Sequence, residues 1–131
     1  MKLLLDTHVW LWSLLEPSRI SPHVSDAIAN TQNELWLSPI SIWELVLLVE
    51  KGRLLLSEGL GGWLRKTWAA LPVIEASLTT EVALALLDVN LAHRDPADRF
   101  LVATARVYDL TLVTADHRLM GSRDWKVLPN R

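Results

Sequence analysis

Cysteine is absent from the 131 residues, which excludes a disulfide framework, a thiolate zinc site, an iron–sulfur ligand set and a thiol nucleophile. A reducing cytoplasm is the compartment that fits this absence best. Long hydrophobic runs are absent too, because the apolar stretch 45–49 stops at Glu50 and Lys51, far short of the ~20 residues that a membrane span needs. We therefore expect no membrane association. Asp6 and His8 interrupt the first apolar stretch, so we also expect no secretory signal.

Hydrophobic residues make up 50% of the chain and charged residues 21%, which indicates a folded protein and not a disordered segment. Repeats and low-complexity tracts are lacking, so we expect one domain over residues 1–131. The net charge of −2 argues against a protein that coats nucleic acid through a basic surface. Basic residues gather late in the chain, where residues 91–131 contain seven basic and five acidic side chains.

Hydrophobic patterns and capping residues predict that strands and helices alternate along the chain. Strands are expected at 2–5, 35–37, 110–114 and 125–128, with a further short apolar run at 73–74. Helices are expected at 8–15, 22–31, 39–51, 62–71, 77–87 and 96–108. Ser21, Ser38 and Asp95 each precede a proline and are interpreted as N-caps. Apolar, non-alternating strands separated by helices are typical of a parallel sheet covered on both faces.

Four acidic residues occupy positions that such a fold can bring together. Asp6 and Asp116 follow predicted strands, and polar groups gather beyond the carboxyl ends of parallel strands. Glu44 and Asp98 lie early in predicted helices, and Asp95 is a possible fifth member. Grouped carboxylates raise one another's pKa, and a divalent cation removes this conflict. Oxygen ligands without cysteine select Mg²⁺ or Mn²⁺ over zinc, and such a site suits hydrolysis of a phosphodiester.

Each of these acids also has a purely structural interpretation. Asp95 is in the first place a helix N-cap, and Asp98 could complete a capping box. Glu44 could lie on a solvated helix face, and Asp116 could form an Asx-turn. Asp6 is the hardest to explain structurally, because an unpaired charge at the buried end of an apolar strand costs several kcal/mol.

Four segments, in this order, resemble the motifs of PIN-domain ribonucleases and in particular of the VapC-like toxins of bacterial and archaeal toxin–antitoxin modules. They are Leu5–His8, Ser38–Leu45, His93–Arg99 and Val113–Asp116. The resemblance implies a small three-layer α/β/α sandwich with a central, mainly parallel sheet. It further implies an endoribonuclease that depends on Mg²⁺ or Mn²⁺, a cognate antitoxin that inhibits it, and homodimerisation.

The same resemblance assigns roles residue by residue. The catalytic and metal-binding acids fall on Asp6, Glu44, Asp98 and Asp116. Of these, Asp6 and Asp98 look like the direct metal ligands, and Asp95 combines capping with a supporting role near the metal. Thr7 and Thr114 are supporting residues as well, whose hydroxyl groups are expected to orient carboxylates or water.

Contacts to RNA are expected from the basic side chains and the histidine that flank these motifs. The candidates are Arg94, Arg99, His117 and Arg118. An internal pairing of Arg99 with a carboxylate is an equally good interpretation. RNA follows from the resemblance alone, since metal-assisted attack by water has no need of a ribose 2′-hydroxyl. The main alternative function is a non-catalytic, metal-binding PIN-like interaction domain.

The seven tryptophans are unusual beside one phenylalanine and one tyrosine. Trp10, Trp36 and Trp43 lie in strongly apolar segments and are expected in the core. Trp63 and Trp68 lie in the least core-like predicted helix. We expect them at an interface, with residues 50–70 helping to form a groove for the antitoxin.

Overall fold

The computed structural model describes residues 1–92 and 95–131 and has a five-stranded sheet at its centre, in the order β3–β2–β1–β4–β5. All four neighbouring pairs are parallel. The strands are β1 (Lys2–Leu5), β2 (Glu34–Leu37), β3 (Ile74–Glu75), β4 (Thr111–Thr114) and β5 (Lys126–Pro129). The predicted parallel sheet is therefore confirmed.

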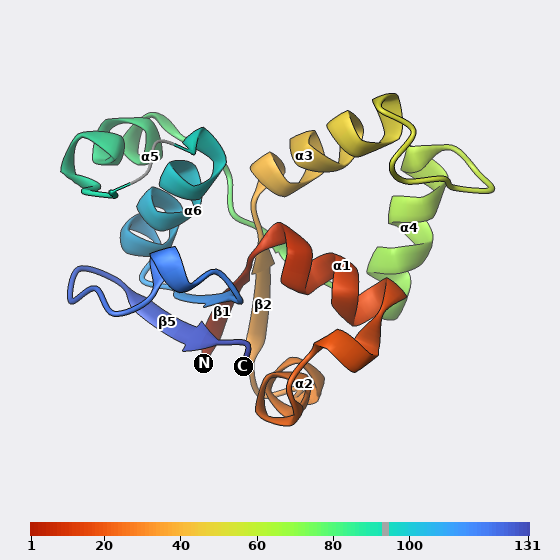
Figure 1. Ribbon diagram of the computed structural model, residues 1–131, viewed down its shortest axis with the longest axis horizontal. Helices are drawn as coiled ribbons and strands as arrows, with labels where there is room; N and C mark the ends of the chain where they lie inside the picture. Colours follow the sequence, from red (N-terminus) through yellow and green to blue (C-terminus); the bar gives the residue numbers. More distant parts are fainter. Residues whose placement is uncertain (93–94) are drawn as a thin grey trace.

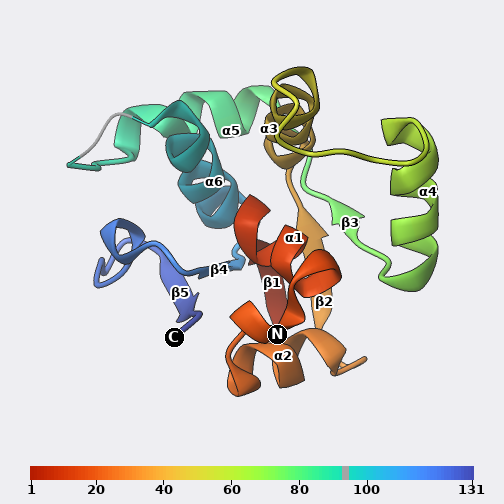
Figure 2. The same cartoon turned by 45° about the vertical axis from the view of Figure 1, so that its right-hand side comes forward.

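Helices cover both faces of this sheet (Figures 1 and 2). The helices are α1 (Thr7–Leu15), α2 (Pro22–Ala29), α3 (Pro39–Glu50), α4 (Leu60–Ala70), α5 (Thr80–Ala85) and α6 (Pro96–Val107). Short 3₁₀ turns lie at Pro17–Arg19, Leu86–Asp88 and His117–Leu119. The result is the expected three-layer α/β/α sandwich. No helix of the described ranges is long and apolar enough to cross a bilayer.

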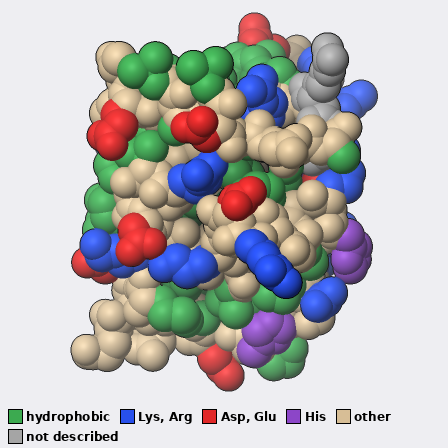
Figure 3. Space-filling model, turned by 90° about the vertical axis from the view of Figure 1, so that its left-hand side faces the viewer, with side chains coloured by type: hydrophobic (Ala, Val, Ile, Leu, Met, Phe, Trp, Pro, Cys, Tyr) green, Lys and Arg blue, Asp and Glu red, His purple; other side chains and the backbone are tan. Residues whose placement is uncertain are grey.

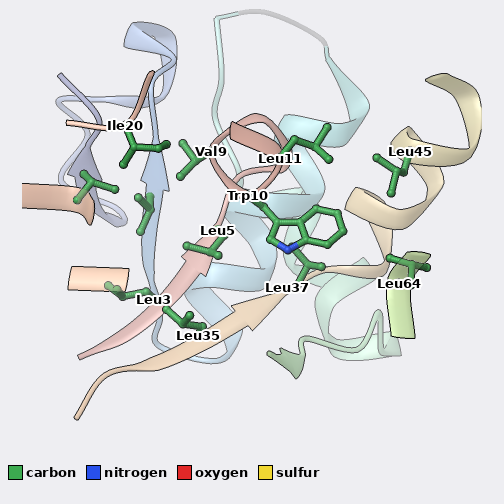
Figure 4. Packing of buried hydrophobic residues seen from close by; sticks show 12 residues of the cluster. Leu3, Leu5, Val9, Trp10, Leu11, Ile20, Leu35, Leu37, Leu45 and Leu64 are labelled. Carbon is green, nitrogen blue, oxygen red and sulfur yellow. The ribbon is translucent and has the colours of Figure 1, made fainter. Parts of the chain in front are cut away.

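Alternating side chains of β1 enter two separate hydrophobic clusters. Leu3 and Leu5 pack with α1, α2, α3 and α4, whereas Leu4 packs with α5 and α6 on the opposite face. All three leucines are fully buried, because a strand with helices on both faces has no solvated side. Trp10 of α1 is also fully buried, and Figure 4 shows it between the strand residue Leu37 and the helical residue Leu45.

The chain changes direction across the sheet at β1. From β1 it runs outward to β2 and then β3, and it later returns to the other side of β1 to form β4 and β5. In an open parallel sheet, such a reversal leaves a crevice outside the carboxyl ends of the strands, where ligands bind. The crevice between β1 and β4 is therefore the place where this topology favours a functional site.

The observed helix boundaries correct three of the predicted ones. The α2 helix ends at Ala29 and not at residue 31. Ser21 occupies the predicted N-cap position but makes no side-chain capping bond, because its hydroxyl donates to Asn130 Oδ1. The α4 helix begins at Leu60, two residues before the predicted start at Gly62, so it includes Gly61 as well. The α5 helix begins only at Thr80, because the Thr79 hydroxyl accepts from the backbone N–H of Val82 at 3.2 Å.

The tryptophans follow the expectations only in part. Trp10 and the partly buried Trp36 belong to the core clusters, but Trp43 is 50% exposed, so its predicted place in the core was wrong. Trp63 packs edge-on against Trp10 with ring centroids 5.9 Å apart and contributes to the core. Trp68 is exposed, as expected for an interface residue.

Candidate active site

A cavity of about 540 Å³ opens beyond the carboxyl ends of β1 and β4, at the reversal of the chain. Half of its lining residues are acidic, and they come from segments far apart in the sequence. The lining consists of Asp6, His8, Trp12, Arg19, Glu44, Asp95, Asp98, Ala115, Asp116 and Arg118. The structure therefore brings all four predicted site acids, and the possible fifth, to one place.

Asp6 directly follows β1 and is the N-cap of α1. Its backbone N–H donates to the carbonyl oxygen of Val113 on β4 at 3.0 Å, and its side chain is buried. The Thr114 hydroxyl donates to Asp6 Oδ2 at 2.6 Å and accepts from the backbone N–H of Asp116 at 3.0 Å. One hydroxyl thus holds both acids that follow neighbouring strands.

Glu44 is half-buried on α3 and is held by two hydroxyl groups in series. Thr7 Oγ1 donates to Glu44 Oε1 at 2.6 Å and lies 2.7 Å from Ser41 Oγ. A hydroxyl has one proton to donate, so the Ser41 hydroxyl is the donor to Thr7. Burial is the main cause that raises the pKa of Glu44; the Thr7 hydrogen bond opposes it, and the charge of Asp6 raises it further.

Asp95 and Asp98 lie at the start of α6. Asp95 is the N-cap, and its Oδ1 accepts from the backbone N–H of Ala97 at 3.0 Å. Asp98 is buried in the first turn, where the positive end of the helix dipole favours a carboxylate. The structural interpretation of Asp95 as a cap therefore holds, and the same residue also lines the cavity.

Asp116 and Arg118 form a tight pair at the turn after β4. Asp116 Oδ1 accepts from the Arg118 backbone N–H at 2.9 Å, which is the Asx-turn that the sequence allowed. The Arg118 guanidinium returns to the same carboxylate, with Nη2 2.8 Å from Oδ2. This nitrogen is also 3.7 Å from Asp98 Oδ2. The hydrogen bond to Asp116 raises the pKa of Arg118. The charged guanidinium lies beside both Asp98 and Asp116.

No three acidic or histidine side chains of the described residues converge closely enough to chelate a metal ion as they stand. Hydroxyl groups and Arg118 hold the carboxylates instead. Like charges at ligand spacing repel one another, so a closer approach of these carboxylates needs a cation between them. The donor set fits Mg²⁺ or Mn²⁺, because it offers several carboxylate oxygens and no thiolate.

Of the residues predicted to contact RNA, some line the cavity and others do not. Arg118 lines the cavity. Arg99 does not, and its Nη2 donates to the carbonyl oxygen of Leu86 at 2.9 Å. His117 is exposed in the turn after Asp116 and is not among the lining residues. Arg94 lies outside the described residues.

Basic residues do not form a broad patch on the visible face that carries α5, α6 and β5. Figure 3 shows positive and negative side chains interspersed over the described part of that face. On this face, any attraction for a polyanion therefore has to come from individual side chains.

Sequence reasoning missed three residues of the cavity wall, namely His8, Trp12 and Arg19. His8 and Trp12 are one helical turn apart on α1, directly after Asp6, and this spacing placed them on one face. That signal was available in the sequence. Arg19 lies in the 3₁₀ turn after α1, and no spacing rule connects it to the acids.

Comparison with known proteins agrees with this architecture. The PIN domain family matches residues 3–121, so the chain belongs to that family. It is 37% identical over 121 residues to Ribonuclease VapC22 of Mycobacterium tuberculosis, which covers 92% of this chain and 91% of the relative.

Solved structures share the fold at low sequence identity. The crystal structure of VapBC2 from Rickettsia felis bound to a DNA fragment from the promoter has a TM-score of 0.71 at 13% identity, with 98% of both chains covered. The crystal structure of DNA-bound VapBC from Salmonella typhimurium has a TM-score of 0.69 at 18% identity, again with 98% of both chains covered. These likenesses establish the fold.

Proposed function

We propose that this chain is a toxin ribonuclease of the VapC kind that hydrolyses RNA phosphodiester bonds with the help of Mg²⁺ or Mn²⁺. One observation carries the proposal: acids from four separate parts of the chain line a single cavity at the chain reversal of a PIN fold. The name of the 37% identical relative supports ribonuclease activity.

The acids divide into two kinds of role in this proposal. Asp6 and Asp98 are buried and line the cavity, and they would be the direct ligands of the cation. Glu44 and Asp116 would complete the site or orient the attacking water. A bound divalent ion supplies a water of lowered pKa and neutralises charge on the phosphate.

Proton transfer falls to Glu44 in this site. Thr7 holds Glu44 Oε1, and burial raises the pKa of the side chain. A carboxylate with a raised pKa is a better acceptor for the proton of an attacking water, and Oε2 is the atom that would receive it. The Thr114 hydroxyl fixes the position of the Asp6 carboxylate relative to the backbone of Asp116, because it hydrogen-bonds to both.

An antitoxin partner is part of the same proposal. Two solved neighbours with this fold are VapBC complexes. A groove of about 370 Å³ beside α3 and α4 includes the exposed Trp68 with Ile42 and Val73. We propose that the antitoxin occupies this groove, to which residues 50–70 contribute Trp68. Homodimerisation and a cytoplasmic location complete the proposal.

Purified protein free of antitoxin, incubated with structured and single-stranded RNA, tests the activity directly. Cleavage is expected with Mg²⁺ or Mn²⁺ and not with a chelator. Asp6→Asn and Asp98→Asn are expected to lower the rate at least about a hundredfold, since each removes a charge that holds the cation. Asp109→Asn is the matched control, because Asp109 is exposed, away from the cavity, and paired with Lys126.

Three results decide between the candidate functions. Metal-dependent cleavage that both site variants abolish supports the ribonuclease. Cation binding by the unchanged chain without cleavage of any RNA supports the non-catalytic metal-binding domain instead. Cleavage that survives chelation and both substitutions contradicts the proposed mechanism. Sequencing the 5′ ends of RNA fragments after expression in cells identifies the target.

A further inference from the structure

One wall of the acidic cavity has a chemistry unlike the rest of it. His8 and Trp12 of α1 lie with ring centroids 5.9 Å apart and their planes at 49°. The guanidinium carbon of Arg19 lies 4.0 Å from the centroid of the Trp12 ring. All three residues line the same cavity as the five acids. The cavity therefore has an acidic floor and an aromatic, basic wall.

Arg19 is fixed from several sides. Its backbone carbonyl accepts from Asn130 Nδ2 at 3.0 Å, and Asn130, buried after β5, also accepts from the Ser21 backbone N–H at 2.8 Å. Its side chain rests on Trp12 and reaches Glu16 Oε2 at 3.4 Å. The guanidinium is thus held beside the indole before any ligand arrives.

The charge around Arg19 differs from that around Arg118. Arg118 is engaged with two acids of the cavity, whereas the acidic partner of Arg19 is Glu16, on an exposed surface outside the cavity lining. An exposed ion pair of this kind is weak. Arg19 is therefore a cation of the cavity wall that can contact a polyanion without releasing a site carboxylate.

The pairing of an indole with a guanidinium suits a nucleobase better than a phosphate alone. Unpaired bases in protein–RNA complexes stack on aromatic rings and on arginine planes, and arginine adds a cation–π contribution. The Arg19 side chain is 53% exposed, so much of the stacked guanidinium is open to a ligand. A binding site for phosphate alone has no need of Trp12 or His8 at its wall.

We propose that the Arg19–Trp12 pair, with His8 beside it, is a stacking platform for one unpaired base of the RNA strand, next to the phosphodiester held over the acids. The proposal rests on the proposed ribonuclease function. It makes the enzyme selective for single-stranded RNA, because a base inside a duplex cannot leave its stack to reach this wall at low cost.

Binding is measured on the full chain carrying Asp98→Asn, so that RNA is held without cleavage. The probe is a fluorescein-labelled ten-nucleotide oligoadenylate, free or annealed to its complement, followed by fluorescence anisotropy. Trp12→Ala is expected to weaken binding of the single strand by about 5- to 150-fold, the range for loss of one stacked base. Trp12→Phe retains a ring and should bind nearly as tightly as the Asp98→Asn parent.

Arg19→Lys separates stacking from charge. Lysine keeps the charge but has no planar group to stack, so this variant is expected to bind several-fold more weakly. Trp68→Ala is the matched control, since Trp68 is an exposed tryptophan of another groove, and its affinity should equal that of the parent. Bound RNA should quench the tryptophan fluorescence of the parent, and Trp12→Phe should lose part of this quenching.

The possible results distinguish a failure of the stacking platform from a failure of the proposed ribonuclease function. If Trp12→Ala keeps its fold but binds within twofold of the parent, or if Arg19→Lys binds as the parent does, the platform is wrong while the ribonuclease can stand. If duplex and single strand bind equally, the platform is wrong as well. If the parent binds no RNA and the unchanged chain cleaves none, both proposals fail. Should Trp12→Ala not fold, the quenching of Trp12→Phe and the affinity of Arg19→Lys decide.

Discussion

At the scale of single residues, hydroxyl groups explain how this chain keeps several carboxylates close together. Thr114 serves Asp6 and the backbone of Asp116 at once, and Thr7 serves Glu44. Hydrogen bonds from neutral donors favour the charged form of a carboxylate, and a bond to a charged group contributes about 1.5–3 kcal/mol. The buried end of β1 can therefore carry an acid in the folded state.

Glu44→Gln is expected to stabilise the protein at neutral pH. The pKa of Glu44 is raised mainly by burial, so the folded chain holds this proton more tightly than the unfolded chain does. That contribution to stability is complete below the unfolded pKa of about 4.3 and is lost as the pH rises through the higher folded pKa. Glutamine cannot ionise and avoids the loss, while its Oε1 can still accept from Thr7.

Thermal melts from pH 4 to pH 8, in the presence of a chelator, measure this effect. The melting temperature of Glu44→Gln relative to the unchanged chain should rise with pH and then level off. Glu50→Gln, at the exposed end of the same helix, is the control for losing one carboxylate. If the difference in melting temperature between Glu44→Gln and the unchanged chain stays constant over this pH range, the raised pKa of Glu44 is not the cause of the stabilisation.

At the scale of secondary-structure elements, the first turn of α6 combines two tasks. Asp95 satisfies the backbone N–H of Ala97 and also faces the cavity, and Asp98 is buried one turn into the helix. The helix end thus gains stability from negative charge, while the same charges build the acidic floor. A substitution at Asp95 can separate these two contributions.

Asp95→Asn and Asp95→Ala are expected to differ in stability. Asparagine caps a helix about as well as aspartate, whereas alanine loses the cap, at a cost of about 1 kcal/mol. Urea unfolding should therefore show Asp95→Ala destabilised and Asp95→Asn close to the unchanged chain. If Asp95 supports the cation, both variants lose RNA cleavage to a similar degree. Equal destabilisation of the two variants would contradict the capping role.

The boundaries of elements were predictable where a single side chain sets them. Ser38 accepts from the N–H of Ile40 at the start of α3, as its place before a proline predicts. The buried face of α3 was not predictable, because its sequence is apolar almost all round. Ser41 and Leu45 turned inward and left Trp43 outside, since only packing against other elements distinguishes these faces.

At the scale of the whole molecule, the strand order made the acids predictable as a group. Asp6 and Asp116 follow strands that proved to be neighbours, and parallel strands place their carboxyl ends at one edge. The sequence carried no such rule for Arg19, which reaches the cavity because Asn130, more than a hundred residues away, fixes its backbone. The acidic floor was therefore foreseeable, whereas its basic wall depends on tertiary contacts.

A divalent cation is expected to stabilise the entire fold, because it binds acids that only the folded chain brings together. A ligand that binds the native state alone adds about 2.7 kcal/mol at a concentration of 100 times its Kd. Thermal melts with rising Mn²⁺ should show a melting temperature that increases for the unchanged chain and for the control Asp109→Asn. The increase should be largely lost in Asp6→Asn and Asp98→Asn.

Asp6→Asn and Asp98→Asn also have an effect on stability in the absence of the cation, and it is opposite in sign to the loss of cation binding. This second effect makes the melting measurement specific for the cation site. Each removes one negative charge from a crowded group, so without the cation their melting temperature can equal or exceed that of the unchanged chain. As Mn²⁺ is added, the unchanged chain should become the more stable one. Because general unfolding or loss of packing would lower the curve of a variant at every concentration, curves that separate in this way only as Mn²⁺ is added indicate cation binding at these acids. Parallel curves for all variants would place the bound ion elsewhere.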